Sequence, residues 1–429
     1  MNFEEHLKKY LDKNTIDLLL NSLDKERTNS LILNKYKINY DDFIHAFPLI
    51  EKHPFLNNVF YYDKSIYEFG KNYLFDNGAY YIMDAASMLV SEILPIQDND
   101  VILDMCAAPG GKSIYLSLKN KNINLISNDI SHERCLKMSS NIEKLGLDNI
   151  IVTNYDFLKD NTNYFDSKFD KIILDAPCSG SAMFRKNDLV KNDWNIKKVL
   201  SLAEIQSNLL NKAYQMLKIN GYIVYSTCSF SFEENEEVIL KFLKEHNDIE
   251  IVPIFNNDSF FRSNELKEAI HLFPCFYKGE GQFIGLLKKK EGNSSSFKNK
   301  KSDMKINLSL IQKYNLNYKY YYNFNNSIYG SNINIDLGKI PILRYGVQLF
   351  EINKNQIIPT FNLAHSLNKF DSVILNEKET KDYIKGLQIN KNLDLPNDFY
   401  IVSYNNLNLG IVKYVNGVLK NYYPKGLRH

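Results

Sequence analysis

Two cysteines lie in short motifs whose residue types favour nucleophilic chemistry. Cys178 stands in the motif DAPCSG, and Cys228 stands in the motif STCS. Each motif follows an apolar run typical of a buried parallel strand, and ligands of parallel sheets bind at the carboxyl ends of the strands. We therefore expect both thiols to face one pocket. An isolated cysteine is more often a small buried apolar residue, which is our interpretation of Cys135 and Cys275.

A loop of small residues precedes these motifs in the segment LDMCAAPGGKS, residues 103–113. Here a predicted strand runs into a turn with Gly110 and Gly111 and then into a helix. The glycines let a ligand approach the backbone, and the helix N-terminus offers free N–H groups to an anion. The ending GKS also closes the P-loop of nucleoside triphosphatases, but that motif needs a glycine where this chain has Cys106. We therefore favour another anionic ligand.

Acidic residues end three of the predicted strands. Asp129 follows the glycine loop by about twenty residues, where a carboxylate can hold two ribose hydroxyls. Asp156, after the next strand, is placed to accept from an adenine amino group, although an ordinary loop position explains it nearly as well. Asp175 ends a further strand, close in sequence to Cys178. The pattern predicts a ligand that contains a ribose.

A thiolate beside a sulfonium methyl donor points to one reaction. C5 of cytosine becomes nucleophilic only after a thiolate adds to C6, and the thiol is eliminated afterwards. An acid that donates to N3 of the ring stabilises the charge of this addition. Asp175 is placed to do so if it is protonated or shares a proton. These residues together predict a cytosine-5 methyltransferase.

An α/β core must position these motifs. Apolar runs predict five parallel strands, and helical patterns at 131–145 and 199–217 end before glycines. Another helix is expected from Ser231, because Ser231 and Glu234 have the spacing of a capping box. The alternation predicts a doubly wound sheet with helices on both faces. The predicted strands are 101–105, 125–129, 150–155, 171–176 and 221–226.

Other segments flank this core, for which we expect the bounds 86–290. Residues 1–85 combine an amphipathic helix at 3–23 with strand-like pieces and predict a small α+β domain. Residues 291–305 are rich in Ser, Asn and Lys and predict a flexible linker. Residues 306–429 contain short strand-like runs separated by turns, so we expect a β-rich region there.

The composition bounds the class of protein. Of the 429 residues, 44% are hydrophobic and 24% are charged, as in folded globular domains. The net charge of +2 says nothing for or against nucleic acid, since 52 basic and 50 acidic residues nearly cancel. The start lacks the pattern of a signal peptide, and no run has the length of a membrane span. The five cysteines include no C-x-x-C pair, so we expect no zinc site, no disulfides and a cytoplasmic location.

On these motifs the chain resembles the NOL1/NOP2/Sun family of RNA cytosine-5 methyltransferases. CAAPGGK, DAPCSG and STCS are similar to the cofactor loop and the two cysteine motifs of that family, in order and in spacing. The ending KNYYPKGLR is similar to the close of the PUA-like domain in bacterial enzymes of the 16S ribosomal RNA methyltransferase F type. The resemblance extends to RTN at 27–29, MDAASM at 83–88, ENE at 234–236 and GEGQF at 279–283.

The resemblance implies a Rossmann-like core with a mixed, mostly parallel sheet, and S-adenosylmethionine as cofactor. It implies small-subunit ribosomal RNA as partner and RNA-binding domains at both ends, in a monomer without metal or membrane. Cys228 would be the nucleophile, Cys178 would assist product release, and Asp175 would act with them. DNA cytosine-5 methyltransferases instead attack with a Pro-Cys cysteine, which would be Cys178 here. The residues implied to bind the cofactor are Cys106, Ala107, Ala108, Pro109, Gly110, Gly111, Lys112, Asp129, Arg134, Asp156 and Asp175.

One stretch departs from the family pattern. After DAPCSG the chain reads SAMFRK, without the acidic residue and glycine that the family commonly has there. Arg185 and Lys186 remain, and they either contact RNA phosphates or form a solvated basic pair. Two other functions also stay open: a transfer RNA cytosine-5 methyltransferase, and an assembly factor that keeps the fold without catalysis.

Overall fold

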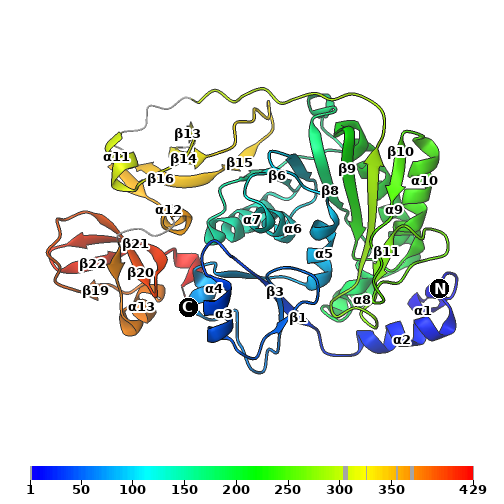
Figure 1. Cartoon of the computed structure of the whole chain (residues 1–429), viewed down its shortest axis with the longest axis horizontal. Helices are drawn as coiled ribbons and strands as arrows, with labels where there is room; N and C mark the ends of the chain where they lie inside the picture. The colour runs from blue at the N-terminus through cyan, green and yellow to red at the C-terminus, as the bar shows by residue number, and fades with distance from the viewer. Residues whose placement is uncertain (1, 303–307, 325, 354–355, 368–371, 429) are drawn as a thin grey trace.

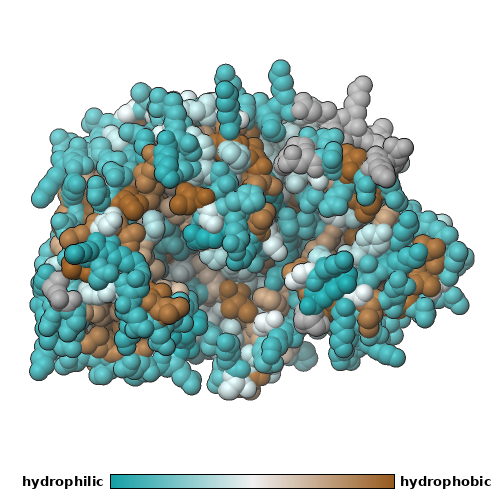
Figure 2. Space-filling model, turned by 180° about the vertical axis from the view of Figure 1, so that it is seen from behind, coloured by the Kyte–Doolittle hydropathy of each residue, from teal (hydrophilic) through white to brown (hydrophobic). Residues whose placement is uncertain are grey.

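The computed structural model describes residues 2–302, 308–324, 326–353, 356–367 and 372–428. Within these ranges the strands form four β-sheets, one in the middle of the sequence and three built from its two ends (Figure 1). No helix in the described ranges is both long enough and apolar enough to cross a membrane. On the face seen in Figure 2, hydrophobic residues lie in small groups among hydrophilic ones.

The central sheet confirms the doubly wound core. Its five parallel strands follow the order β7-β6-β5-β8-β9, so the order reverses between β5 and β8. Such a reversal opens a crevice at the carboxyl ends of the strands, where ligands bind. The strands are β5 (Val101–Asp104), β6 (Asn124–Asn128), β7 (Ile150–Thr153), β8 (Phe169–Asp175) and β9 (Leu217–Thr227).

Antiparallel strands extend this sheet on both sides. Beyond β9 lie β12 (Gln282–Lys289), β10 (Ile249–Val252) and β11 (Ile270–Leu272), and beyond β7 lies β15 (Ile342–Tyr345). The C-terminal region therefore contributes a strand to the sheet that carries the predicted chemistry. The stretch from residue 291 to 302 contains no helix or strand, and Asn293 and Ser295 form backbone hydrogen bonds with Ile219 and Ser167.

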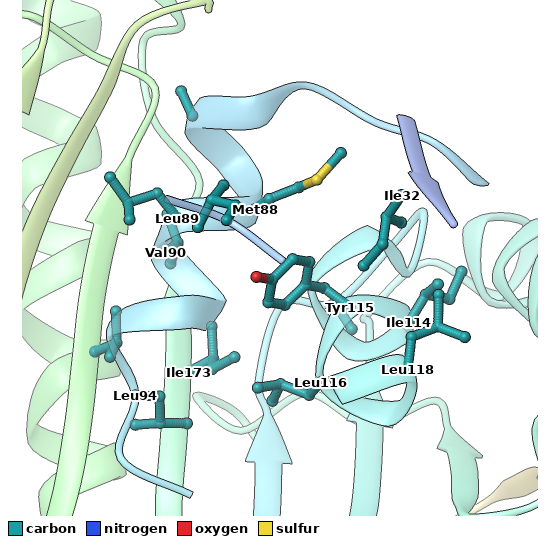
Figure 3. Packing of buried hydrophobic residues seen from close by; sticks show 14 of the residues in the cluster. Ile32, Met88, Leu89, Val90, Leu94, Ile114, Tyr115, Leu116, Leu118 and Ile173 are labelled. Carbon is teal, nitrogen blue, oxygen red and sulfur yellow. The ribbon is translucent and has the colours of Figure 1, made fainter. Parts of the chain in front are cut away.

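Helices cover both faces because neighbouring strand residues point to opposite sides. Ile102 packs with the helices α5 (Ala85–Ile93), α6 (Gly111–Lys119) and α7 (His132–Leu145). Leu103 packs instead with α9 (Ile196–Met216) and α10 (Glu236–Glu245). Figure 3 shows Met88 and Leu89 of α5 beside Tyr115 of α6.

Local signals set both ends of α7 but not every predicted helix end. Gly221, expected to terminate the helix before it, lies inside strand β9, and α9 already ends at Met216. The Ser131 side chain accepts from the Arg134 N–H at the start of α7, and Gly146 ends that helix in the left-handed conformation, as predicted. The capping box predicted at Ser231 is wrong. The Ser231 side chain caps nothing, a 3-10 turn at Phe232–Glu234 intervenes, and α10 begins only at Glu236.

The N-terminal part divides differently from the prediction. The amphipathic segment forms two helices, α1 (Phe3–Leu7) and α2 (Lys13–Leu23), because Asp12 caps a second start. These helices pack on the domain of the central sheet around Phe230 and Phe273 (Figure 1). The α+β unit follows, with an antiparallel sheet in the order β2 (Glu51–Lys52), β3 (Val59–Tyr62), β1 (Asn29–Leu33), β4 (Tyr80–Ile82), and helices α3 (Tyr40–Ala46) and α4 (Tyr73–Asp76).

The C-terminal part is β-rich, as predicted. One sheet has the order β13 (Tyr320–Phe324), β14 (Ser327–Ser331), β16 (Val347–Asn353), β17 (Gln356–Pro359). The other has the order β18 (Val373–Ile374), β20 (Phe399–Tyr404), β21 (Leu407–Val415), β22 (Val418–Asn421), β19 (Ile389–Asn390). The remaining helices are α8 (Asp188–Asp193), α11 (Leu308–Lys313), α12 (Phe361–Ser366) and α13 (Glu377–Ile384), with short 3-10 turns at Asn163–Phe165, Ser181–Met183 and Lys425–Leu427.

Three parts of the chain meet where α7 ends. From the N-terminal part, Asn34 donates to the carbonyl of Leu145, and the Lys37 ammonium donates to the carbonyl of Lys144 at 2.9 Å. From the C-terminal part, His365 contacts Lys37 Nζ through Nδ1 at 3.2 Å, and the buried Arg344 donates to the carbonyls of Leu147 and Ile150. We call Asn34, Lys37, Arg344 and His365 the junction.

Candidate active site

The carboxyl edge of the central sheet collects the three predicted motifs. The glycine loop leaves β5, DAPCSG leaves β8 and STCS leaves β9, and β8 lies between the other two strands. Asp175 and Ser226 are register partners at the ends of β8 and β9. The loops after these strands must therefore start side by side.

The two cysteines lie in direct contact. Their Sγ atoms are 2.9 Å apart, and both side chains are half-buried. This hydrogen bond raises the pKa of Cys178, as does burial, so Cys178 holds its proton more firmly than a free thiol. The two thiols lie together, as the sequence predicted. Their separate roles in a reaction do not follow from this contact alone.

Asp175 accepts hydrogen bonds from three side chains. Lys112 Nζ donates to Oδ2 at 2.7 Å, while Ser226 Oγ and Gln282 Nε2 donate to Oδ1 at 2.7 and 3.0 Å. Burial alone would lower the pKa of Lys112, but Asp175 outweighs it and raises that pKa. The arrangement is an ion pair between an ammonium group and a carboxylate.

The glycine loop wraps tightly over the sheet edge. Gly110 has a φ of +100°, and a Cβ there would lie 2.8 Å from Met138 Cγ. A Cβ on Gly111 would lie 2.9 Å from the sulfur of Met83. Helix α6 begins directly after this turn and presents its free N–H groups. The loop can thus hold an anionic group close to its backbone.

Asp104 lies beneath the loop at the end of β5 and is fully buried. Its Oδ2 accepts from Ser113 Oγ at 2.7 Å, while Oδ1 has no hydrogen-bond partner among the described residues. Burial raises the pKa of Asp104 to about 7. An unpaired buried carboxylate oxygen fits a ligand that brings its own donor, such as an amine. The sequence reasoning did not single out this residue, although a carboxylate directly after an apolar strand was a signal.

The other acidic residues differ in how they are engaged. Asp129 is buried at the end of β6 and pairs with Arg134, with 3.1 Å from Oδ2 to Nη1. Arg134 also donates to the carbonyl of Ala108, so it links Asp129 to the glycine loop. Asp156 accepts from the backbone N–H groups of Leu158 and Lys159 in its own turn. Such hydrogen bonds are typical of an aspartate in a turn. They do not show that Asp156 binds a ligand, so that role stays a proposal.

The basic pair after DAPCSG is split. The Arg185 side chain is 5% exposed and donates to Glu280 Oε2 at 2.9 Å and to the carbonyl of Gly279, so it is not a solvated basic group. A contact with RNA phosphates stays a prediction. Lys186 is exposed. Glu280 also accepts from Arg27 Nε at 3.4 Å, so one carboxylate joins the N-terminal part to this edge of the core.

A polar hollow of about 1080 Å³ adjoins this edge. It is lined by cationic side chains that include Lys25, Arg27 and Lys64, together with Tyr62 and Asp63. Arg185 forms part of its wall, three residues after Ala182, whose N–H donates to the carbonyl of Cys228. A residue in the wall of the hollow is thus only a few positions in the sequence from a residue that contacts the Cys228 backbone.

Comparison with known proteins identifies the family. A model described as 16S rRNA methyltransferase RsmB/F matches residues 91–288, and a model described as methyltransferase RsmF PUA domain matches residues 370–429. The chain therefore carries a domain like that of the RsmB/F methyltransferases, followed by one like the PUA domain of RsmF. The predicted resemblance is confirmed, and the chain is an S-adenosylmethionine-dependent RNA methyltransferase.

Curated relatives agree over most of the chain. Ribosomal RNA small subunit methyltransferase F of Shewanella piezotolerans is 28% identical over 82% of this chain and 79% of its own length. The enzyme of the same name from Shewanella loihica is 26% identical over 97% and 92%. A human 28S rRNA (cytosine(4447)-C(5))-methyltransferase is 36% identical over 49% of this chain and 28% of its own length.

Solved structures share the fold of the core. NSun6 from Pyrococcus horikoshii, solved with SFG, has a TM-score of 0.61 at 21% identity and covers 68% of this chain and 98% of its own. A methyltransferase homologue from the same organism has a TM-score of 0.56 at 27% identity and covers 66% and 93%.

Proposed function

We propose that this enzyme methylates C5 of a cytosine in 16S ribosomal RNA through a covalent bond between Cys228 and C6. The observation that carries the proposal is the contact of two thiols, 2.9 Å apart, at the edge of a methyltransferase sheet. Methylation of a ring carbon by this route needs a nucleophile that adds and a second group that helps release. Two adjacent thiols fit both needs.

S-adenosylmethionine fits the edge between the glycine loop and β6. The helix start at Gly111 suits its carboxylate, the unpaired Asp104 oxygen suits its amine, and Asp129 suits its ribose hydroxyls. Asp156 is proposed for the adenine amino group, and Arg134 is proposed to hold Asp129 in place. When bound, the cofactor supplies an electrophilic methyl group.

Different residues of the chain act at different atoms of the cytosine. The Cys228 thiolate adds to C6, and the electron pair of the C5–C6 bond moves so that C5 becomes nucleophilic. The Lys112–Asp175 pair neutralises the charge that develops at N3. After methylation C5 loses its proton to solvent, the electron pair of that C–H bond re-forms the C5–C6 double bond, and the C6–S bond breaks to return the Cys228 thiolate. Cys178 assists this release.

Electrostatics favours Cys228 over the Pro-Cys residue as nucleophile. The pKa of Cys178 is raised by its hydrogen bond to Cys228 and by burial, so the Cys178 thiol keeps its proton and is a poor nucleophile. The Lys112 ammonium interacts electrostatically with Cys228, and a nearby cation stabilises a thiolate. This supports the assignment that the resemblance implies.

RNA is proposed to enter through the polar hollow that Arg185 lines. A target base must leave its stack before C6 can meet a thiol, and single-stranded segments are the usual form in which RNA bases are presented. Within the described residues, Lys25 and Lys64 form no ion pair, so their ammonium groups are free to bind phosphates. The match of the last sixty residues to the RsmF PUA domain favours 16S ribosomal RNA over transfer RNA.

Bisulfite sequencing tests the proposal. Total RNA is compared between cells with and without the gene. The deletion strain is then complemented with the wild-type gene or with the Cys228→Ala variant. We expect protected cytosines to disappear from 16S RNA in the deletion strain and to return only with the wild-type gene. Loss confined to transfer RNA would overturn the substrate, and no loss in any RNA would favour the assembly factor.

A further inference from the structure

The loops that carry the two cysteines extend beyond the sheet that aligns them. The register between β8 and β9 ends at Asp175 and Ser226, two to three residues before the cysteines. We call residues 176–181 the Cys178 loop and residues 227–231 the Cys228 loop. A contact outside the strand ladder must hold these loops so that the thiols stay 2.9 Å apart.

Two hydrogen bonds join the loops directly, from the Phe230 N–H to Ser181 Oγ at 2.8 Å and between the hydroxyls of Ser179 and Ser229 at 3.1 Å, and Glu234 adds a third link. Its carboxylate is fully buried and accepts from the Ser179 N–H at 2.7 Å and from the Ser179 hydroxyl, both in the Cys178 loop. It also accepts from the hydroxyl of Ser229, in the Cys228 loop. Each serine follows a cysteine directly in the sequence. One carboxylate therefore fastens both loops immediately next to their thiols.

The backbone around Glu234 is itself held in place. The Tyr225 hydroxyl donates to the Glu234 carbonyl, and Asn235 Nδ2 donates to the Ser229 carbonyl at 2.8 Å. On the carboxylate side, Gln206 Nε2 donates to Oε1 at 3.0 Å and to the Pro177 carbonyl at 2.9 Å. Strand β9 and helix α9 thus fix the position of the carboxylate from both sides.

A carboxylate is a costly choice if only packing were needed. Burying an ionised group is unfavourable unless hydrogen bonds compensate, and an apolar side chain of similar size would avoid that cost. Here four donors compensate, and they lie on the two cysteine loops and on α9. The negative charge also acts on Cys178, whose pKa is raised first by its bond to Cys228, then by burial, and further by Glu234.

We propose that Glu234 is a positioning residue that fixes the two thiols relative to each other. In this arrangement Cys228 attacks the base and Cys178 assists release. The proposal rests on the function proposed above, but its central readout needs no RNA. Glu234 contacts neither thiol and acts through Ser179 and Ser229.

The test compares full-length wild type with Glu234→Gln, which keeps the size of the side chain and removes its charge. Glu237→Gln is the matched control, because Glu237 is exposed three residues later. Each protein is treated with iodoacetamide, and the labelling rates of individual cysteines are followed by mass spectrometry. The half-buried Cys275 is the internal reference, since general loosening of the fold would change its rate as well.

We expect the wild type to label faster at Cys228 than at Cys178. In Glu234→Gln the ratio of these rates should fall about tenfold, as a change of one pKa unit would produce, with Cys275 unchanged. Single-turnover methylation at saturating S-adenosylmethionine should fall about 100-fold, the effect of a small misplacement of reacting groups. Glu237→Gln should match the wild type in both measurements.

Ser229→Ala covers the case in which Glu234→Gln does not fold, because it removes one donor and leaves the carboxylate paired with Ser179. It should lower the labelling ratio in the same direction by a smaller factor. An unchanged ratio in the folded variants would overturn the role of Glu234. A wild type that methylates no RNA while the labelling ratio still shifts would overturn the proposed function and leave the positioning intact.

Discussion

The carboxyl edge of the central sheet and the junction at the end of α7 both bury charged groups, but they satisfy them differently. At the edge, side chains pair with side chains, as Lys112 does with Asp175. At the junction, Lys37 and Arg344 donate to backbone carbonyls. Carbonyls at a helix end are fixed and carry negative potential, so they suit cations that serve stability. Side-chain partners can be exchanged for a ligand, which suits catalysis.

The two regions also differ in what they leave unpaired. At the edge, Asp104 keeps a buried oxygen without a partner among the described residues, and the two thiols reach partial exposure. At the junction, Asn34 and Lys37 each reach two backbone carbonyls, and the buried Arg344 Nε, which makes no hydrogen bond among the described residues, lies 3.9 Å from Glu143 Oε1. Changes at the edge should therefore affect rate more than stability, and changes at the junction should do the reverse.

The largest effect is expected from the cysteines. Cys228→Ala should lower methylation by on the order of 10⁴-fold or more, because no other group forms the bond to C6. Cys178→Ala should retain attack and accumulate a protein–RNA adduct, because release is impaired. Both are measured by methyl transfer from labelled cofactor and by denaturing gels that retain covalent adducts. An active Cys228→Ala protein, or an adduct that forms in it, would contradict the assignment.

The ion pair at the edge should give the next largest effect. Lys112→Met removes the cation beside Asp175 and should slow single-turnover methylation by about 100-fold at saturating cofactor. The control is Lys119→Met at the other end of α6, which breaks an ion pair with Glu92 away from the cysteines. Equal rates for the two variants would show that the pair at Asp175 has no special part in the reaction.

The junction should show its effect in stability as the pH falls. His365 is buried, and burial followed by Lys37 lowers its pKa well below the unfolded value. The unfolded chain then binds more protons, so stability is full above the unfolded pKa of about 6.5 and declines below it, by at most about 1.4 kcal/mol per pH unit for this group. Urea unfolding at pH 7.5 and 5.5 measures the decline.

His365→Gln should flatten this decline, and His45→Gln, at an exposed position, should not. A second contribution comes from His53, whose pKa burial lowers to about 4, so part of the decline between pH 6.5 and 4 should persist in His365→Gln. A decline of equal steepness in wild type and His365→Gln would rule out the junction as the acid-sensitive element. Methylation rates at pH 7.5 should be the same in all three proteins.

The smallest effect is expected from the exposed cations of the hollow. Lys64→Gln and Arg27→Gln should weaken RNA binding with little change in the rate at saturating RNA, and each should reduce the slope of log affinity against log salt by about 1. Lys241→Gln, on the exposed side of α10, is the control. Salt slopes identical to the wild type would place the RNA elsewhere.

Much of the fold and the site could be predicted because the signals are local. The apolar runs of β5 to β9 predict buried parallel strands, and such strands bring the segments that follow them to one edge. This was enough to expect Cys178, Cys228 and Asp175 in one place. Helix α7 was predicted to within one residue at its start because Ser131 and Gly146 act on neighbouring backbone groups.

Elements that depend on distant partners could not be predicted. Glu234 has the spacing of a capping residue, yet its carboxylate binds serines that the fold brings from two other loops. Arg185 was predicted to contact RNA phosphates or to be solvated, and only the fold shows that it donates to Glu280, far along the chain. Strand β15 joins the central sheet from a region expected to be separate, because pairing with β7 satisfies backbone groups that no local pattern reveals.

The sequence by itself determined the class of chemistry, since the order and spacing of a glycine loop, an aspartate and two cysteines suit one reaction on a parallel sheet. The tertiary structure decided how those groups are controlled. It paired Asp175 with Lys112, tied the two thiols to one buried carboxylate, and joined both ends of the chain to α7. The reason is physical: residue types set which bonds are possible, whereas hydrogen bonds and ion pairs form only between groups that folding brings within about 3 Å of each other.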